Sequence, residues 1–275
     1  MISVSLTTTR QRLDLCHAAL TSILLQSFLP DRINLWISRE PYLKDRGIVE
    51  DEPIEQLLAS LPRESAGRVV VHWVKNTGPY RKLIPILREA TADEVIVTAD
   101  DDIFYGRRWL NGLLEAYEGH SGVPVAARVR LIRSSAFGRK ASYIYWPLCK
   151  DTVLLKQNYA ITFGGGAVLT RSMFQEKDIY DDSFLTLAPT ADDLWYSHLL
   201  LRRNLPVYVV PHLMADLNFL KHDGGLMEDN VRRGSSSLKK LRALVFDCPL
   251  GLAGIPVCGN DVALKQIQQY FSCKH

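Results

Sequence analysis

The chain has 275 residues, enough for one large α/β domain, and its 47% hydrophobic and 23% charged residues are typical of an ordinary folded protein. This composition excludes a disordered or fibrous protein. The net charge of only +3 argues against a general nucleic-acid-binding protein, so no nucleic-acid partner is expected.

The cysteines argue against a zinc site and against a disulfide framework. They are odd in number, widely spaced and without a CxxC pair. The chain starts without a charged leader and apolar segment, and no stretch reaches the ~18 apolar residues of a membrane span. The expected location is therefore the cytoplasm, where thiols remain reduced.

The first hundred residues alternate short β-branched runs with segments of helical spacing. Strands are predicted at 2–6, 33–38, 69–74 and 95–99, and helices at 11–26, 54–61 and 79–90. Such alternation predicts a mostly parallel sheet with right-handed crossovers.

The pattern becomes less regular after a predicted helix at 107–117. Strand-like segments at 123–132 and 143–146 precede a glycine turn and strand at 163–169, and a helix at 191–203 precedes a last strand at 207–210. This region predicts a smaller mixed sheet with longer loops, which are suited to a second binding site. A glycine-rich loop at 212–237 and helices at 238–246 and 261–271 complete the prediction.

Three consecutive carboxylates, Asp100, Asp101 and Asp102, follow the buried strand at 95–99. Open α/β sheets bind ligands at this end of their strands. Adjacent carboxylates repel one another unless water solvates them or a divalent cation neutralises them. The alternative is a solvated acidic turn that caps the segment 105–117.

Four segments in order carry a resemblance: ISVSLTTTR, TADDDIFYGRRWL, FGGGAVLTRSMF and TADDLWYSHLLLRRNLPVYVVP. Together they resemble the nucleotide-sugar-dependent glycosyltransferases of the GT-A fold, in particular the large bacterial family of inverting enzymes. The resemblance extends from about residue 2 to about residue 234. Two features depart from the family: an Asp-Asp pair replaces Glu-Asp, and the Gln-x-x-Arg-Trp segment is missing, for which 230–233 is a candidate substitute.

The resemblance implies a single GT-A, Rossmann-like domain over 1–275, with a mostly parallel central sheet flanked by helices. Its nucleotide-sugar-binding half would span 1–105, its acceptor and catalytic half 106–237, and a helical extension 238–275. The acidic triplet would be the DXD metal motif for Mn²⁺ or Mg²⁺. Asp102 is then the first choice for the metal ligand, with Asp100 near the ribose or a metal-bound water and Asp101 adjacent.

The second acidic pair, Asp192 and Asp193, begins the helix predicted at 191–203. An acceptor hydroxyl is a poor nucleophile, so a carboxylate must take its proton as it attacks. The resemblance assigns this base to Asp193 and a supporting role to Asp192, with inversion at the sugar. The alternative is that both carboxylates only complement the helix dipole.

Further candidates surround these carboxylates. The opening loop would hold the nucleotide, and the turn after the strand at 69–74 offers base or phosphate contacts, or else is a capped turn with a solvated basic face. The donor-side residues are Thr7, Thr8, Thr9, Arg10, Asn76, Arg81 and Lys82, with Asp100 and Asp101.

On the acceptor side, Gly164, Gly165 and Gly166 allow close backbone approach, and Trp146 is a candidate for stacking on a sugar, although an aromatic segment is more often core. His212 and His222 are candidates to complete the metal site or to bind diphosphate. A lone histidine is more often a structural residue.

The sequence therefore predicts an inverting hexosyl- or related sugar transferase. Its partners would be a nucleotide-diphosphate sugar and a glycan or lipid-linked glycan acceptor of a surface polysaccharide, with peripheral association at the inner membrane face. A nucleotidyltransferase is disfavoured because Thr7, Thr8, Thr9 and Arg10 lack the glycines of its phosphate loop. An inactive nucleotide-sugar-binding or glycan-binding module remains the non-enzymatic alternative.

Overall fold

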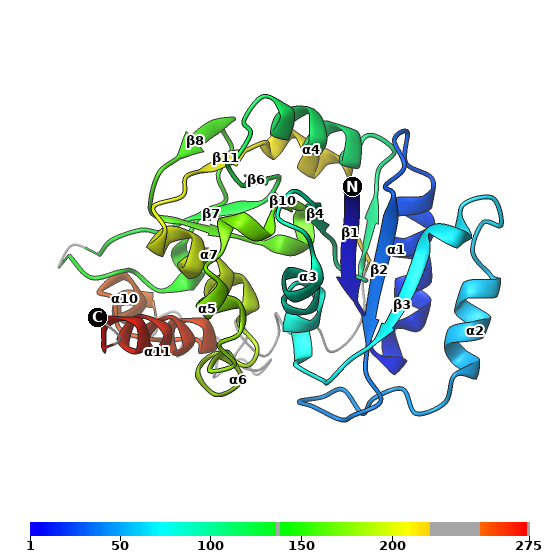
Figure 1. Ribbon diagram of the computed structural model, residues 1–275. Helices are drawn as coiled ribbons and strands as arrows, with labels where there is room; N and C mark the ends of the chain where they lie inside the picture. Colours follow the sequence, from blue (N-terminus) through cyan, green and yellow to red (C-terminus); the bar gives the residue numbers. More distant parts are fainter. Residues whose placement is uncertain (136–137, 221–247, 274–275) are drawn as a thin grey trace.

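The computed structural model describes residues 1–135, 138–220 and 248–273. Within these residues the core of the fold is an eight-stranded sheet (Figure 1). In spatial order its strands are β3 (Val69–Trp73), β2 (Arg32–Ile37), β1 (Ile2–Thr7), β4 (Val95–Thr98), β10 (Ala167–Leu169), β6 (Val125–Ala126), β11 (Val207–Val209) and β8 (Val153–Leu155).

The first four strands of that order form a parallel half, as alternating strands and helices predict. The other half is mixed, because β10 runs antiparallel to both β4 and β6, and β8 runs antiparallel to β11. Two small two-stranded sheets are separate from it: β5 (Ile103–Tyr105) with β12 (Leu217–Phe219), and β7 (Val129–Leu131) with β9 (Tyr159–Ile161). The α/β class, with a mostly parallel central sheet flanked by helices and a smaller mixed region, is confirmed.

Helices cover both faces of the sheet (Figure 1). One apolar core lies under α1 (Leu13–Leu24), α2 (Glu52–Ala59) and α4 (Trp109–Glu118), and it includes Val97 of β4. The other lies under α3 (Ile84–Glu89), α7 (Asp192–Arg202) and α11 (Gly259–Cys273), and it includes the neighbouring Ile96. Adjacent residues of one strand thus enter opposite cores, as the two-residue period of a strand requires.

Shorter elements connect these layers. The α-helical ones are α5 (Glu176–Ile179), α6 (Phe184–Leu187) and α10 (Cys248–Leu252). The 3₁₀ turns are η1 (Arg10–Arg12), η2 (Ala66–Arg68), η3 (Gly78–Lys82), η4 (Tyr143–Tyr145), η5 (Phe163–Gly165), η6 (Arg171–Met173) and η7 (Pro211–Asp216).

Several predicted elements differ in the structure. The helix predicted at 79–90 is divided into η3 and α3, where Pro85 lies in the first turn of α3 and has no N–H to continue a helix from η3. The strand predicted at 123–132 is split into β6 and β7, and the aromatic segment at 143–146 forms η4 instead of a strand. The segment after the acidic triplet forms β5, and α4 has no side-chain cap. The helix-capping alternative for the triplet is therefore wrong.

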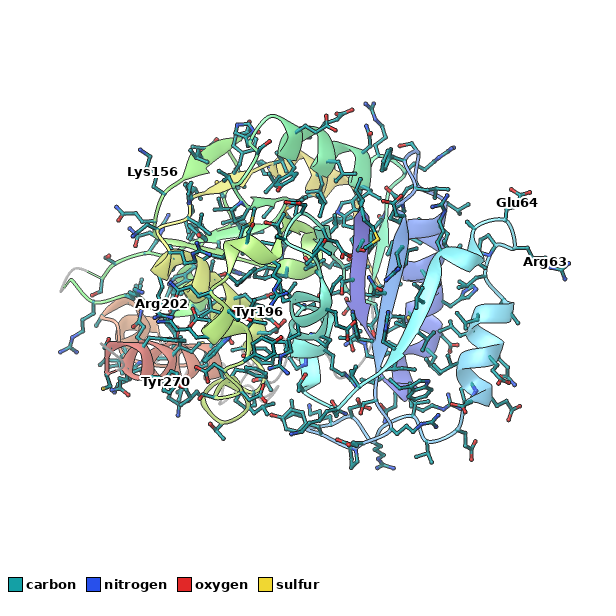
Figure 2. All side chains as sticks on the ribbon, viewed as in Figure 1. Arg63, Glu64, Lys156, Tyr196, Arg202 and Tyr270 are labelled. Atoms are coloured by element: carbon teal, nitrogen blue, oxygen red, sulfur yellow. The ribbon has the colours of Figure 1, made fainter. Side chains whose placement is uncertain are left out.

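The last helix, α11, packs against α7. Trp195 and Phe271 have ring centroids 5.3 Å apart, and the Arg202 guanidinium lies 4.0 Å from the Phe271 ring centre. Figure 2 labels Arg202 and Tyr270 on these two helices. The predicted helix at 238–246, the candidate segment 230–233 and His222 lie outside the described residues. Within the described ranges, no helix has both the length and the apolar character needed to cross a bilayer.

Candidate active site

Asp100 begins the candidate site at the carboxyl end of β4. Its Oδ1 accepts a hydrogen bond from Lys82 Nζ at 2.8 Å, and its backbone N–H donates to the Tyr105 hydroxyl at 2.7 Å. Tyr105 in turn donates to the Gly164 carbonyl at 2.7 Å. Burial acts to raise the pKa of Asp100, but Lys82, with smaller contributions from Arg12 and Arg128, lowers it below its ordinary value. Asp100 is therefore held as an anion.

Asp101 points into the protein. It is 5% exposed, and its Oδ2 accepts a hydrogen bond from Thr8 Oγ1 at 2.7 Å. Its Oδ1 forms an ion pair with the Arg12 guanidinium at 2.6 Å. Burial raises the pKa of Asp101 to about 7, although Arg12 and Thr8 oppose the rise. Asp101 thus ties the opening loop to the end of β4, and its carboxylate is not available to a ligand.

Arg12 also forms an ion pair with Asp102, where its guanidinium lies 2.7 Å from Oδ2. The side chain of Asp102 is 26% exposed. Carboxylate oxygens from Asp100 and Asp102 suit a hard divalent cation, so the donor chemistry at this edge fits Mn²⁺ or Mg²⁺. Among the described residues, however, no group of three or more His, Cys, Asp and Glu side chains is arranged to hold a metal. A cation here would need other oxygens, such as those of a diphosphate.

Lys82 joins the triplet to the second acidic pair. Its ammonium, on a side chain 7% exposed, lies 2.8 Å from Asp100 Oδ1 and 3.1 Å from Asp192 Oδ2. Burial alone would lower the pKa of Lys82, but the two carboxylates raise it well above its ordinary value. Asp192 is itself buried, and burial, opposed by Lys82, raises its pKa. One buried cation therefore bridges β4 and the first turn of α7.

Asp193 is the second residue of α7, and its Oδ1 accepts a hydrogen bond from the Phe163 N–H at 3.0 Å. Burial, followed by the negative charge of Asp192, raises the pKa of Asp193 to about 7. A carboxylate with a pKa near neutrality combines a large ionised fraction with real basicity. This contact and the raised pKa make Asp193 a candidate general base.

The glycine turn, Gly164 to Gly166, lies between the acidic triplet at 100–102 and the acidic pair at 192–193. A Cβ on Gly164 would lie 1.9 Å from Asp100 Oδ2, and a Cβ on Gly165 would lie 2.6 Å from Arg128 Cβ. Gly166 has φ +102°, and its missing side chain leaves room for the indole of Trp109. These glycines are required because backbone and active-site side chains approach closely here.

The remaining donor-side candidates mostly form hydrogen bonds with other residues of the protein. Thr7 donates to the Trp36 carbonyl at 2.7 Å, and the Thr9 carbonyl accepts from the Arg12 N–H at 3.0 Å. Asn76 donates to Asp45 at 2.9 Å, and Arg81 donates to the same carboxylate at 2.8 Å.

Arg81 is nonetheless an unusual structural cation. It is only 1% exposed, and among the described residues its Nε and one terminal nitrogen have no hydrogen-bond partner. Its remaining terminal nitrogen also donates to the Thr8 carbonyl at 3.2 Å. The turn after β3 is thus packed against the opening loop rather than forming a solvated basic face.

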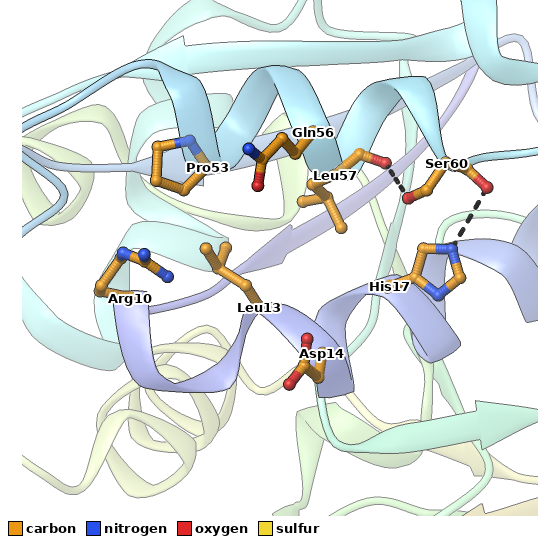
Figure 3. A pocket seen from close by; sticks show the side chains of 8 residues that line it. All are labelled: Arg10, Leu13, Asp14, His17, Pro53, Gln56, Leu57 and Ser60. Atoms are coloured by element: carbon orange, nitrogen blue, oxygen red, sulfur yellow. Dashed lines mark hydrogen bonds between the residues drawn. The ribbon is translucent and has the colours of Figure 1, made fainter.

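Arg10 is exposed at the start of η1. It borders a pocket between α1 and α2 (Figure 3), lined by Arg10, Leu13, Asp14, His17, Pro53, Gln56, Leu57 and Ser60. This pocket shares no residue with the carboxylate cluster. The lining of this pocket includes Arg10 but none of the other donor-side candidates.

Trp146 is 1% exposed, and its Nε1 donates to the Ala141 carbonyl at 2.9 Å. It belongs to the core, so the suggestion that it stacks on a sugar is wrong. His212 is exposed in η7.

Sequence reasoning missed Arg12, Arg128, Tyr105 and Asp45. Arg12 neutralises two of the three triplet carboxylates, and Asp45 pairs with Arg81. Arg128 lies against Gly165 and the glycine turn. The sequence contains one signal for Arg12: it lies two residues after the proposed nucleotide-binding loop, so it is a candidate to neutralise the acidic triplet.

Comparisons with known proteins give likeness at the level of the fold. No family model matches the sequence, and no curated protein matches it. One similar solved structure is 4-diphosphocytidyl-2C-methyl-D-erythritol synthase from Anaerococcus prevotii, with 13% identity, a TM-score of 0.44 and coverage of 76% of this chain and 86% of that one.

Two further similar structures are those of residues 1–349 of TarS from S. aureus, each with a TM-score of 0.48. The sequence identity is 14% for the structure of TarS alone and 15% for its complex with UDP. In both, 76% of this chain is covered, and the match spans 58% and 57% of the TarS chain.

Proposed function

We propose that this chain is an inverting glycosyltransferase that moves a sugar from a nucleoside diphosphate to a hydroxyl of a glycan or lipid-linked glycan. The observation that carries the proposal is the pair of carboxylates across the glycine turn. Asp100, held as an anion by Lys82, lies on one side, and Asp193, with a pKa of about 7, lies on the other. The transfer needs one carboxylate that helps to bind the donor and a second that takes the proton from the acceptor hydroxyl.

The donor would lie at the carboxyl ends of β1 and β4. Thr7, Thr9 and the turn at Asn76 would border the nucleotide, and Lys82 would face its diphosphate. Asp100 and Asp102 are proposed to hold Mn²⁺ or Mg²⁺, which when bound offsets the negative charge of the leaving diphosphate. Asp101 is not proposed as a metal ligand, because both of its carboxylate oxygens already contact Thr8 and Arg12.

The reaction follows from these positions. Asp193 takes the proton from the acceptor hydroxyl as its oxygen forms a bond to the anomeric carbon. The bond from that carbon to the diphosphate oxygen breaks, and its electron pair leaves with the diphosphate. Attack from the face opposite the leaving group inverts the configuration. Asp192 and Lys82 hold the first turn of α7 beside the donor. The acceptor would belong to a surface polysaccharide assembled at the inner membrane face.

Two substitutions test the division of roles. Asp193→Asn should lower transfer by about a hundredfold or more, because the base is lost, while nucleotide affinity stays nearly unchanged. Asp102→Ala should weaken nucleotide binding that depends on manganese. Calorimetric titration with UDP, GDP, dTDP and CMP, with and without manganese, measures the binding. Equal loss of nucleotide affinity in the two variants would contradict these roles, and no binding by the wild-type protein would remove the basis of the proposal.

A further inference from the structure

The basic residues of the chain are unevenly distributed. The segment 119–150 contains no Asp or Glu and six basic residues, so it carries +6. The whole chain carries +3, which leaves −3 for all other residues together. The basic residues of this segment are Arg128, Arg130, Arg133, Arg139, Lys140 and Lys150.

Arg128 brings this basic segment to the candidate site. Its carbonyl accepts hydrogen bonds from the Thr162 N–H at 2.9 Å and from the Thr162 hydroxyl at 3.0 Å. The next residue, Phe163, donates its N–H to Asp193. Gly165 lies directly against the Arg128 side chain. Arg128 is therefore fixed to the same turn that holds the proposed base.

The guanidinium of Arg128 lacks a polar partner in the part of the chain that the structure describes. Its Nε is buried without a hydrogen bond, and its nearest ring contact is Phe219, 5.5 Å from Cζ. Arg130, two residues later, is already occupied, since it donates to the Trp146 carbonyl at 2.8 Å and lies over the Tyr143 ring. A half-buried guanidinium with unused donors is suited to a planar anion such as a phosphate or carboxylate.

We propose that Arg128 selects an acceptor that carries a negatively charged group, a phosphate or a carboxylate, close to the hydroxyl that reacts. This inference rests on the proposed function, because it assigns the acceptor of the same site.

The acceptor is a better assignment than the donor diphosphate or a lipid surface. Arg128 lies on the mixed half of the sheet, between β6 and β7, and touches the turn bonded to Asp193, whereas Lys82 already lies between Asp100 and Asp192. A half-buried guanidinium is better suited to a discrete anionic group than to a flat membrane surface.

The test uses the full chain and small acidic probes with their neutral counterparts. Glycerol 3-phosphate and glucuronic acid are titrated beside glycerol and glucose at low salt. Binding is followed by calorimetry and by the side-chain Nε–H NMR resonance of Arg128, which is assigned by its loss in Arg128→Lys. Arg133→Gln, an exposed arginine of the same segment, is the matched control.

The wild-type protein should bind at least one acidic probe and neither neutral one. Arg128→Gln should weaken that binding about tenfold or more, Arg128→Lys should weaken it less, and Arg133→Gln should leave it within about twofold. Nucleotide affinity should be the same in all of these proteins.

Two results would overturn the inference: no acidic probe shifts the Arg128 resonance, or Arg128→Gln lowers nucleotide affinity and leaves probe binding intact. The second would place the guanidinium on the donor diphosphate. Failure of the proposed function is a separate result, since the wild-type protein would then bind no nucleotide whether or not the acidic probes bind.

Discussion

Asp193, the proposed base, faces opposing demands from folding and from chemistry. A base must be ionised, yet the burial that raises its pKa to about 7 makes the ionised form costly in the folded state. The unfolded chain has no such cost, because an exposed aspartate ionises near pH 3.9. Between these two values the folded protein binds more protons than the unfolded one, so this residue lowers stability as pH rises from about 4 to about 7.

Asp193→Asn should therefore stabilise the protein at pH 8, by about 1–2 kcal/mol, because the amide keeps an oxygen for the Phe163 N–H without the buried charge. The gain should shrink towards zero near pH 4. Urea denaturation at several pH values measures it, with Asp93→Asn at an exposed position as the control. A gain that does not depend on pH would show that the charge of Asp193 is not its cause.

Arg10 and Arg12 differ in role although they are two residues apart. Arg10 is exposed, whereas Arg12 is paired with Asp101 and Asp102. Arg12→Ala should cost about 2–4 kcal/mol, because Asp101 would keep a buried carboxylate without its cation, and Arg10→Ala should cost less than about 0.5 kcal/mol. Chemical denaturation of the two variants at pH 8 provides the comparison. Similar losses would mean that the ion pairs of Arg12 contribute little.

At the scale of elements, the glycine turn η5 lies between Asp100 and Asp193, the carboxylates proposed for the donor side and the acceptor side. Gly164→Ala should displace the Asp100 carboxylate, since the new methyl group would overlap both Oδ2 and Cγ. Nucleotide affinity should fall about tenfold, and stability should fall by about 1–3 kcal/mol. Gly67→Ala is the matched control, because a Cβ there meets nothing within 4 Å. Unchanged nucleotide affinity in Gly164→Ala would show that the carboxylate moves without consequence.

The elements also show how far the sequence predicts the structure. Strands β1 to β4 and helices α1 and α7 agree with their predicted positions within a few residues, because each has a clear hydrophobic period. The pieces η4, β6 and β7 were not predicted individually. They are too short for a period to be recognised, and long-range contacts determine them, such as the pairing of Val129 with Ile161.

The candidate site was predictable to a similar degree. The positions of the carboxylates after β4 and at the start of α7 follow from local patterns. Their partners do not, because the contacts of Arg12 with Asp101 and of Arg128 with the glycine turn join distant parts of the chain. Trp146 was misplaced because a sequence shows that a ring is present but not which side chains cover it.

At the scale of the whole molecule, the mixed half of the sheet depends on the C-terminal helix. Phe271 of α11 is 3% exposed and packs on Trp195 and Arg202 of α7. Phe271→Ala should cost about 3–4 kcal/mol, whereas Gln266→Ala, on the exposed face of the same helix, should change stability by less than about 0.5 kcal/mol. Thermal unfolding of both variants measures the difference. A loss below about 1 kcal/mol in Phe271→Ala would show that α11 is not part of the cooperative core.

Lys82 couples the two halves of the molecule. Its single ammonium contacts Asp100 at the end of β4 and Asp192 at the start of α7. A ligand that changes the charge beside Asp100 therefore changes how strongly Lys82 attracts α7, and thermodynamic linkage requires the reverse effect to be equally large. In the proposed transferase, the binding of donor and of acceptor would therefore be coupled through Lys82, and the occupancy of one site would change the affinity of the other.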